Sequence, residues 1–396
     1  MDEVFDVIVV GAGPGGAQCA RELSKKGWRV ALIEKNKEIG EPNFSTAGTT
    51  DYLLKEFNLP QSVVGTSWDK VSIISSFNEY NWKFDKVRGY VLKFDELKKF
   101  LTKEALDNGC QVYSGSAVKG PLLENGKVVG VEFEDSAKDG LRGKIIVDAS
   151  GALAVIASKI GLRKQVLAYP AEGLEYIMNN VNFPLKNTLY TYLGRKYVPH
   201  GYGWIFPMGE HTAKVGIAIY EAEKYKKDNK SMLDMLKEFI EKLPWLKGAT
   251  YDELHGGSIY VTGGIKNYVH DNVLAVGDAG AQINPLAGEG IRHAMRAGNM
   301  AAENIDKALK DNDLSKLKSY EKEWKKYTGI KWKLSEIIEQ LIYHRLNDKQ
   351  QDRFLYYCRN FSSQDVFDIM FEYKFRIFFK ALKPISPLSL IRSFKT

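Results

Sequence analysis

The first forty residues contain the clearest pattern of hydrophobic and polar segments in the chain. An apolar run over residues 4–10, broken by Asp6, leads into a glycine-rich turn. A segment of helical composition over 17–26 and a second apolar run over 29–33 follow. A strand, a helix and another strand in this order are typical of a βαβ unit. The pattern therefore predicts a fold of the α/β class that begins with such a unit.

Helices and strands continue to alternate after this unit. Further helical patterns lie over 51–58, 95–108, 231–243 and 290–308. Further strand patterns lie over 71–76, 80–84, 111–118, 127–134, 144–147, 188–193, 201–207, 214–220 and 272–276. The strands between 167 and 261 are long and rich in aromatic residues, which indicates a separate unit with its own sheet. Residues from 314 onward are mainly helical in pattern.

The composition is that of an ordinary globular protein. The 396 residues include 56 Lys and Arg against 49 Asp and Glu, a formal charge of +7, and 44% of the residues are hydrophobic. These values exclude a wholly disordered or collagen-like chain. No apolar run reaches the length of a membrane span and no basic leader precedes the first strand, so we expect an unexported, cytoplasmic protein.

Cysteines, histidines and basic residues favour neither a metal site nor nucleic acid. Cys19, Cys110 and Cys358 are odd in number and far apart, so we expect reduced, structural thiols. The six histidines lack the spacing of metal ligands, and we expect no metal site. Basic residues alternate with acidic ones over most of the chain, which favours solvated helix faces over a surface for nucleic acid.

The glycine-rich turn has the spacing of a dinucleotide-binding loop. Gly11, Gly13 and Gly16, with Gly15 beside them, would allow a tight turn, the approach of a pyrophosphate and the packing of helix on strand. Glu34 ends the second strand, where a carboxylate can accept ribose hydroxyls and would repel a 2′-phosphate. The turn predicts a dinucleotide site for FAD or NAD, and the alternative is a turn that only packs a helix on a sheet.

A second glycine-rich segment favours FAD over NAD. Asp278 follows a late apolar strand, and Pro285, Gly288 and Gly290 lead into a long helix that begins near Ile291. An acid in this place can bind a ribityl hydroxyl, and the helix N-terminus can stabilise negative charge on a reduced flavin. The alternative is an aspartate that only caps a helix.

Two further motifs carry a resemblance to a known family. Asp148-Ala-Ser-Gly151 matches a segment of FAD-dependent hydroxylase-like flavoproteins. The segment 199–207 matches the Pro-x-x-Tyr-x-Trp-x-Phe-Pro signature of the geranylgeranyl reductase family at all its fixed positions, namely Pro199, Tyr202, Trp204, Phe206 and Pro207. The chain thus resembles this family, which uses reduced FAD to saturate double bonds of isoprenoid chains in lipids, chlorophyll side chains or quinone tails.

The resemblance implies a fold and a division into domains. The expected fold is a Rossmann-type FAD-binding domain with an inserted antiparallel β-sheet that binds substrate, followed by C-terminal helices. We expect the FAD-binding domain over 1–61, 89–166 and 262–308. The substrate-binding sheet is expected over 62–88 and 167–261, and the C-terminal helical region over 309–396.

The resemblance also implies further flavin contacts. In the loop 40–48, Ser45, Thr46 and Gly48 would contact the cofactor, as would Val118. Family members commonly carry a cysteine where this chain has Ser45. They also often carry an arginine before the Phe94-Asp95 pair, which here follows Lys93. These two positions set the chain apart from the usual family pattern.

The signature strand has the spacing of an apolar face. Tyr202, Trp204 and Phe206 alternate with other residues, so they project from one side of a strand that Pro199 and Pro207 flank. Three aromatic side chains on one face are often plain core. Together with the two flavin motifs, they favour a wall that binds a long hydrocarbon above a flavin.

The expected reaction is the reduction of an alkene. A hydride from reduced FAD would reach one carbon and a proton the other, with Tyr202 as the candidate catalytic residue in the proton path. The chain shows no second dinucleotide motif, and NAD(P)H, a ferredoxin or another electron-donor protein remain open as the reductant.

Two other functions are compatible with the same motifs. A flavin monooxygenase or halogenase would use oxygen on the same fold, although the chain lacks the Trp-x-Trp-x-Ile-Pro segment of halogenases. A prenyl-binding escort protein would have lost its flavin, and the intact nucleotide motifs argue against it.

The C-terminal segment 371–383 combines aromatic and basic residues. This combination suits a helix that makes a peripheral contact with an anionic membrane. It equally suits a helix that packs on the protein with a basic outer face.

Overall fold

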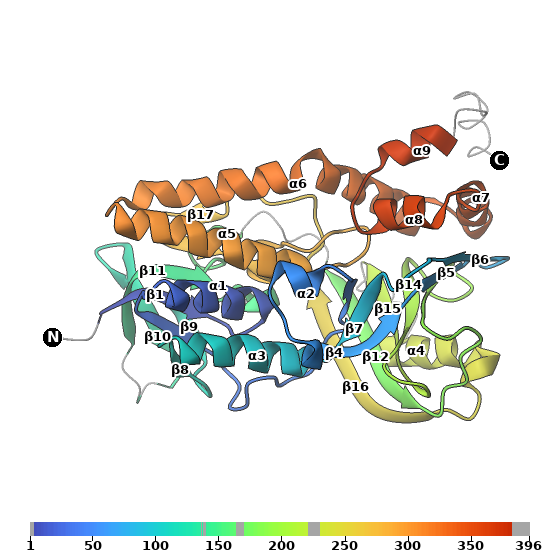
Figure 1. Ribbon diagram of the computed structural model, residues 1–396, viewed down its shortest axis with the longest axis horizontal. Helices are drawn as coiled ribbons and strands as arrows, with labels where there is room; N and C mark the ends of the chain where they lie inside the picture. Colours follow the sequence, from blue (N-terminus) through green and yellow to red (C-terminus); the bar gives the residue numbers. More distant parts are fainter. Residues whose placement is uncertain (1–3, 136, 138–139, 164–169, 221–229, 382–396) are drawn as a thin grey trace.

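The computed structural model describes residues 4–135, 137, 140–163, 170–220 and 230–381. It contains a largely parallel sheet, a mainly antiparallel sheet beside it, and a row of C-terminal helices that runs along both (Figure 1). The predicted α/β fold with an antiparallel sheet and C-terminal helices is confirmed, whereas the exact domain boundaries stay a prediction.

The first sheet has the strand order β17-β18-β11-β1-β2-β8, and β11, β1, β2, β8 and β18 are parallel where they pair. Its strands are β1 (Val4–Val10), β2 (Val30–Ile33), β8 (Gln111–Tyr113), β11 (Leu141–Asp148), β17 (Val269–His270) and β18 (Val273–Ala275). A hairpin of β9 (Val118–Glu124) and β10 (Lys127–Phe133) attaches to β11. The parallel strands end at one edge, where an α/β sheet binds its ligands.

Three helices pack against this sheet and one another, namely α1 (Pro14–Lys25), α3 (Phe94–Asp107) and α5 (Ile291–Lys310). Pro14 occupies the first turn of α1, where its missing amide hydrogen costs no helical hydrogen bond. Gly298 lets α5 approach α1, because a Cβ at this position would lie 3.2 Å from the backbone nitrogen of Cys19. The three cysteines are buried, free thiols.

The second sheet has the order β16-β12-β15-β14-β13-β5-β6 and is antiparallel except between β13 and β5. Its strands are β5 (Lys70–Ile74), β6 (Glu79–Lys83), β12 (Ala171–Asn179), β13 (Thr188–Leu193), β14 (Gly201–Pro207), β15 (Thr212–Tyr220) and β16 (Thr250–Ile259). The helix α4 (Met232–Glu241) covers one face, where Phe239 packs with Ile205 and Val215. The opposite face, which carries Tyr202, Trp204 and Phe206, is turned toward the first sheet's loops.

Small elements connect the two sheets. A three-stranded sheet is formed by β3 (Gly48–Thr50), β7 (Gly89–Leu92) and β4 (Val64–Trp68). The short helix α2 (Leu53–Glu56) follows β3. Single 3-10 turns lie at Gln61–Val63, Gly151–Leu153, Pro244–Leu246, Gly277–Gly280 and Leu314–Leu317.

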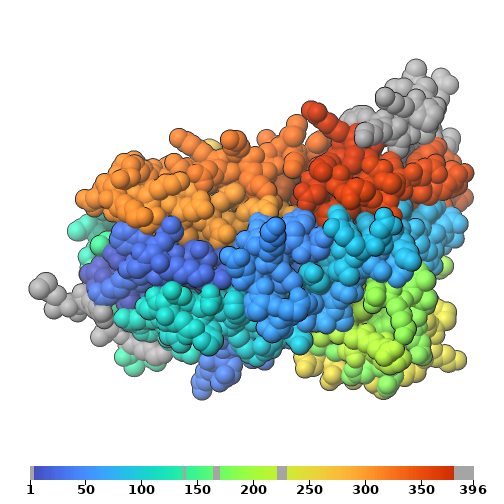
Figure 2. Space-filling view, viewed as in Figure 1, coloured from blue at the N-terminus to red at the C-terminus, as the bar shows by residue number. Residues whose placement is uncertain are grey.

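The C-terminal helices span both sheets. The helix α6 (Lys318–Glu339) packs on α5 and bends at Gly329, and a π-helical turn (Gln340–Arg345) follows it. The helices α7 (Asp348–Cys358), α8 (Ser363–Met370) and α9 (Arg376–Ala381) complete this region. Asp352 accepts hydrogen bonds from Asn78 and Tyr80 of the β5–β6 hairpin. In Figure 2 these orange and red segments extend along one edge of the whole molecule.

Most predicted elements are confirmed, but two differ in extent and several strands were not predicted. The predicted strand over 111–118 is interrupted, because β8 ends at Tyr113 and β9 begins at Val118. The predicted helix over 51–58 is only one turn long. The strands β3, β4, β7, β12 and β16 were not predicted. In β16 the mostly exposed Asp, Glu, His, Gly and Ser residues lack an apolar alternation.

The aromatic residues of the C-terminal segment point inward. Phe371, Tyr373 and Phe375 are buried, whereas Lys374 and Arg376 between them are exposed. The expectation that these three aromatic side chains contact lipid is therefore wrong, because α6 and α8 already cover them. Residues 382–396 lie outside the described ranges. Among the helices of the described residues, none is long and apolar enough to span a bilayer.

Candidate active site

The glycine-rich turn lies between β1 and α1 at the carboxyl edge of the first sheet. A Cβ at Gly11 would lie 2.8 Å from the carbonyl carbon of Ala149, and one at Gly16 would lie 2.8 Å from the Cβ of Ala149. A Cβ at Gly13 would meet no protein atom within 4 Å. Gly11 and Gly16 thus allow close packing, while Gly13 borders open space in front of the α1 N-terminus. This space fits a pyrophosphate, which the free amides of a helix start attract.

Glu34 is held beside this turn. Its Oε2 accepts a hydrogen bond from the Ala12 amide at 3.0 Å, and its Oε1 accepts one from the Asn36 amide at 2.9 Å. Val118, at the start of β9, is buried in the same cluster as Val10 and Ile33. These contacts fix a carboxylate at the end of β2, where a ribose would lie if a dinucleotide followed the usual path.

Asp278 is placed as a flavin ligand would be. It follows β18, and a Cβ at Gly290 would lie 4.0 Å from its Oδ1. The carboxylate is half-buried and caps no helix, and no hydrogen bond joins it to another of the described residues. Burial raises the pKa of Asp278 to about 6, against the opposing charge of Arg163. A half-buried carboxyl group without a donor among the described residues fits a ligand hydroxyl, as the ribityl chain of FAD would supply.

Side chains from α6 hold the second glycine-rich segment. Gln282 accepts from the Gly277 amide at 2.7 Å and donates to Tyr320 at 2.9 Å. Asn284 donates to the Ser335 hydroxyl at 3.1 Å. Pro285 is buried, and Gly288 has a φ of +62°, which favours glycine.

The helix α5 then begins at Ile291, with Gly290 as its N-cap and no side-chain cap. Its first amides are thus free of side-chain partners and carry the positive end of the helix dipole. This end can stabilise an anion at the second glycine-rich segment.

The aromatic face of β14 meets both loops. A Cβ at Gly48 would lie 2.6 Å from the Phe206 ring, and a Cβ at Gly288 would lie 3.0 Å from the Tyr202 hydroxyl. The Tyr202 ring also stacks on Tyr343 of the π-helical turn at 5.5 Å between centroids. Burial raises the pKa of Tyr202 to about 12, so its hydroxyl keeps its proton at neutral pH.

Pro199 precedes β14 and the buried Pro207 ends it, so both flank the aromatic face. The carbonyl oxygen of Pro207 accepts a hydrogen bond from Thr66 at 2.6 Å. This bond ties the end of β14 to β4.

Sequence reasoning missed three charged residues on the same face: Glu175, Lys214 and His255. Glu175 accepts hydrogen bonds from Thr46 at 2.9 Å and from the Trp204 indole at 3.0 Å, and Lys214 donates to the carbonyl oxygen of Ser45. All three are less than 5% exposed. The signal in the sequence was a charged residue at a strand position whose side chain points into the protein. Such positions can be recognised only when the register of the strands is known.

The charges of these residues are coupled. Burial alone would raise the pKa of Glu175, but the His255 contact and the Lys214 charge outweigh it and lower that pKa. The Glu175 carboxylate raises the pKa of His255. Burial lowers the pKa of Lys214, and the nearby Glu175 opposes this shift. The face therefore combines an apolar wall with a buried, charged group.

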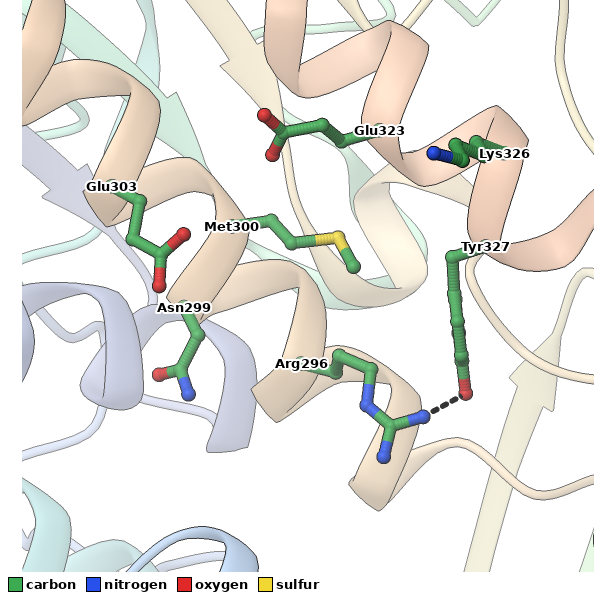
Figure 3. A pocket seen from close by; sticks show the side chains of 7 residues that line it. All are labelled: Arg296, Asn299, Met300, Glu303, Glu323, Lys326 and Tyr327. Atoms are coloured by element: carbon green, nitrogen blue, oxygen red, sulfur yellow. Dashed lines mark hydrogen bonds between the residues drawn. The ribbon is translucent and has the colours of Figure 1, made fainter.

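A groove of about 550 Å³ lies elsewhere, between α5 and α6 (Figure 3). Charged side chains line it, including Arg296, Glu303 and Lys326, and Arg296 donates to the Tyr327 hydroxyl. None of the predicted flavin or substrate residues lines this groove. Its charged side chains suit neither a flavin nor a hydrocarbon.

Comparisons with known proteins agree with this geometry. Residues 6–55 match the family model "FAD dependent oxidoreductase", and residues 171–254 match "Geranylgeranyl reductase catalytic domain". The fold and the site thus define an FAD-dependent oxidoreductase.

Two curated relatives identify the family within this class of oxidoreductases. A digeranylgeranylglycerophospholipid reductase of Methanocaldococcus jannaschii is 34% identical over 89% of this chain and 90% of its own length. The reductase of the same name from Haloferax volcanii is 31% identical over 88% of each chain. The chain therefore belongs to the geranylgeranyl reductase family, and the predicted family, enzyme class and FAD dependence are confirmed.

Two solved structures have a fold similar to that of this chain. A geranylgeranyl bacteriochlorophyll reductase-like protein from Thermoplasma acidophilum superposes with a TM-score of 0.88 at 27% identity, covering 100% of this chain and 99% of that one. A flavin-dependent brominase gives a TM-score of 0.74 at 20% identity, covering 94% and 93%, and shares the fold alone.

Proposed function

We propose that the protein reduces carbon–carbon double bonds in geranylgeranyl chains carried on a glycerophospholipid. The observation that carries this proposal is the contact of one aromatic strand face with both flavin loops, through Phe206 at Gly48 and Tyr202 at Gly288. An aromatic wall suits a hydrocarbon substrate. The curated relatives are named for reducing such a lipid.

We propose the following roles for the residues that hold the cofactor. The loop at Gly11, Gly13, Gly15 and Gly16 would bind the pyrophosphate, with Glu34 at the ribose and Val118 beside the adenosine. Asp278 would bind a ribityl hydroxyl. The residues Ser45, Thr46, Gly48, Pro285, Gly288, Gly290 and Ile291 would surround the flavin ring. Reduced FAD, when bound, supplies the hydride.

The chain's own residues would carry the rest of the reaction. Trp204, Phe206 and Tyr202 would hold the isoprenoid, exclude water and stabilise positive charge that develops on the alkene through their ring faces. The N-terminus of α5 would stabilise the complementary negative charge. Tyr202, protonated at neutral pH, is the proposed proton donor at this face. An unchanged reduction rate in Y202F would remove its hydroxyl from the proton path.

The test is direct. Protein loaded with FAD is reduced anaerobically with dithionite and mixed with digeranylgeranylglycerophospholipid in detergent micelles. We expect the flavin to be reoxidised and the lipid to gain two hydrogens for each double bond, as read by mass spectrometry. Flavin that stays reduced beside unchanged lipid refutes the proposal. Oxygen consumed in step with substrate under air would instead indicate a monooxygenase, and a purified protein that binds no FAD would indicate an escort protein.

The electron donor and the membrane contact are separate proposals. NAD(P)H and a ferredoxin are both candidates, and anaerobic reduction of the loaded protein by each distinguishes them. Because the substrate is a membrane lipid, we propose a peripheral contact of the cytoplasmic protein through its exposed Lys374 and Arg376. Equal flotation of wild type and a K374E/R376E variant with anionic liposomes would refute this contact.

A further inference from the structure

One row of residues crosses four strands on the face that meets the flavin loop. His255 of β16 pairs with Glu175 of β12, which pairs with Gly216 of β15, which pairs with Trp204 of β14. Gly216 leaves room for the indole, since a Cβ there would lie 2.5 Å from Trp204 Cε2. The indole therefore lies across β15 and reaches the Glu175 carboxylate.

The same row continues outward to solvent and inward to the flavin loop. The Glu253 side chain is 60% exposed, and its Oε2 lies 2.8 Å from His255 Nε2. His255 Nδ1 lies 3.7 Å from Glu175 Oε1, and Glu175 Oε2 accepts from the Thr46 hydroxyl at 2.9 Å. The Phe44 ring covers His255 at 4.7 Å between centroids. Titratable and hydroxyl groups thus form a line from the surface to Thr46, between aromatic side chains.

Stability does not explain this line. Burying a carboxylate and an imidazole is costly, and apolar side chains in their place are often no less stable. Glu175 Oε1 and His255 Nδ1 are both buried without a hydrogen-bond partner among the described residues. A structural pair would satisfy these atoms. The 3.7 Å gap between them is one that a small side-chain rotation closes.

We propose that Glu253, His255, Glu175 and Thr46 form the route by which protons enter the active site. This inference rests on the proposed reduction of a double bond. Each double bond reduced takes up two electrons and two protons in total. One of these protons comes from water when NAD(P)H supplies a hydride to FAD, and both come from water when a ferredoxin supplies only electrons. The described residues that pack around Tyr202 are aromatic or apolar, among them Trp204 and Tyr343, so another group has to replace a proton that it gives up.

One proton would pass along this route in each cycle, and every residue of the route would return to its starting protonation state. Protonated His255 gives its Nδ1 proton to Glu175 Oε1. The neutral Glu175 carboxyl group then rotates so that its proton stands on the side of Thr46. The Thr46 hydroxyl accepts this proton and releases its own toward the substrate side. Solvent then reprotonates His255 through Glu253. His255, Glu175 and Thr46 would act on protons rather than on the hydride.

The surrounding charges support a protonated His255. It faces Glu253 on its own strand and Glu175 on β12, and both raise its pKa against the effect of burial. Lys214 on β15 faces Glu175 from the other side, and Asp95 of α3 acts on Lys214 in turn. We therefore expect the rate of alkene reduction to fall as the pH rises through the pKa of His255.

The test uses the FAD-loaded protein and two kinds of readout. In histidine NMR titrations, E175Q should lower the pKa of His255. In single-turnover reoxidation by the lipid, H255Q should be at least about tenfold slower, lose the fall in rate at high pH, and recover partly with added imidazole. E253Q, at the exposed end, tests the route without disturbing the core. The matched control is H270Q, since His270 is exposed on β17 of the other sheet.

The outcomes separate this inference from the proposed function. Wild-type protein that leaves the lipid unreduced refutes the proposed function, and this inference with it. Wild-type protein that reduces the lipid, while H255Q and E253Q keep its rate and pH profile, refutes only the proton route. An H255Q variant that binds FAD as wild type does, yet reacts slowly and responds to imidazole, supports it.

Discussion

Gly216 gives a sharp test of the packing under the flavin loop, because the structure predicts a change opposite in sign to the usual one. Glycine inside a strand generally costs about 0.5–1 kcal/mol relative to alanine, so replacement by alanine should stabilise β15. Here the new Cβ would lie 2.5 Å from Trp204 Cε2 and 2.7 Å from Glu175 Cβ. Trp204 Cζ2 would be closer still, so the indole would have to move by roughly 1.1 Å to restore ordinary contact.

The magnitude follows from these contacts. Overpacking costs about 1–3 kcal/mol, and a hydrogen bond to a charged group is worth about 1.5–3 kcal/mol. If the Trp204–Glu175 bond is lost, G216A should be less stable than wild type by about 2–5 kcal/mol, after the gain in strand propensity. Urea unfolding followed by tryptophan fluorescence measures this difference.

The control lies on a neighbouring part of the same sheet. A Cβ at Gly257 of β16 would meet no atom within 4 Å, so G257A should be at least as stable as wild type. If G216A unfolds at the same urea concentration as wild type or higher, the packing of Trp204 across β15 is refuted.

Two further predictions concern the cofactor site. Because Gly13 borders open space, G13A should leave the unfolding free energy of the apo-protein within about 0.5 kcal/mol of wild type. The same variant should weaken FAD binding at least about tenfold in a fluorescence titration. Equal FAD affinity would contradict the assignment of this turn to the pyrophosphate. Since the pKa of Asp278 is raised to about 6, the native apo-protein retains a proton that the unfolded chain releases near pH 4, so its stability falls as the pH rises through this interval. D278N removes this loss of stability. Its free energy of unfolding relative to wild type, measured in urea, should rise by at most about 3 kcal/mol between pH 4 and pH 7. A difference independent of pH would show that the pKa of Asp278 is not raised.

Local features of the site could be predicted from the sequence. The turn at Gly11–Gly16, the carboxylate of Glu34 and the alternation of Tyr202, Trp204 and Phe206 each depend on residues close together in the chain. Their geometry follows from one strand or one strand–helix junction, so a short pattern suffices.

The buried charged group could not be predicted in this way. Glu175 and His255 are 80 residues apart and meet only through the register of β12 and β16, which the mostly polar sequence of β16 does not indicate. The burial of Phe371 and Tyr373 against the protein could not be predicted either. An amphipathic pattern shows that one face of a segment is covered, but it does not show whether protein or lipid covers that face. Long-range pairing decides both cases.

The hydrogen bonds from Gln282 and Asn284 to Tyr320 and Ser335 of α6 affect the order in which the site can form during synthesis of the chain. The loop expected to enclose the flavin is completed by a helix synthesised well after the loop itself. During translation, therefore, the nucleotide end of the site can form on the ribosome long before the flavin end is braced. Secure capture of the cofactor has to wait until α6 has left the exit tunnel.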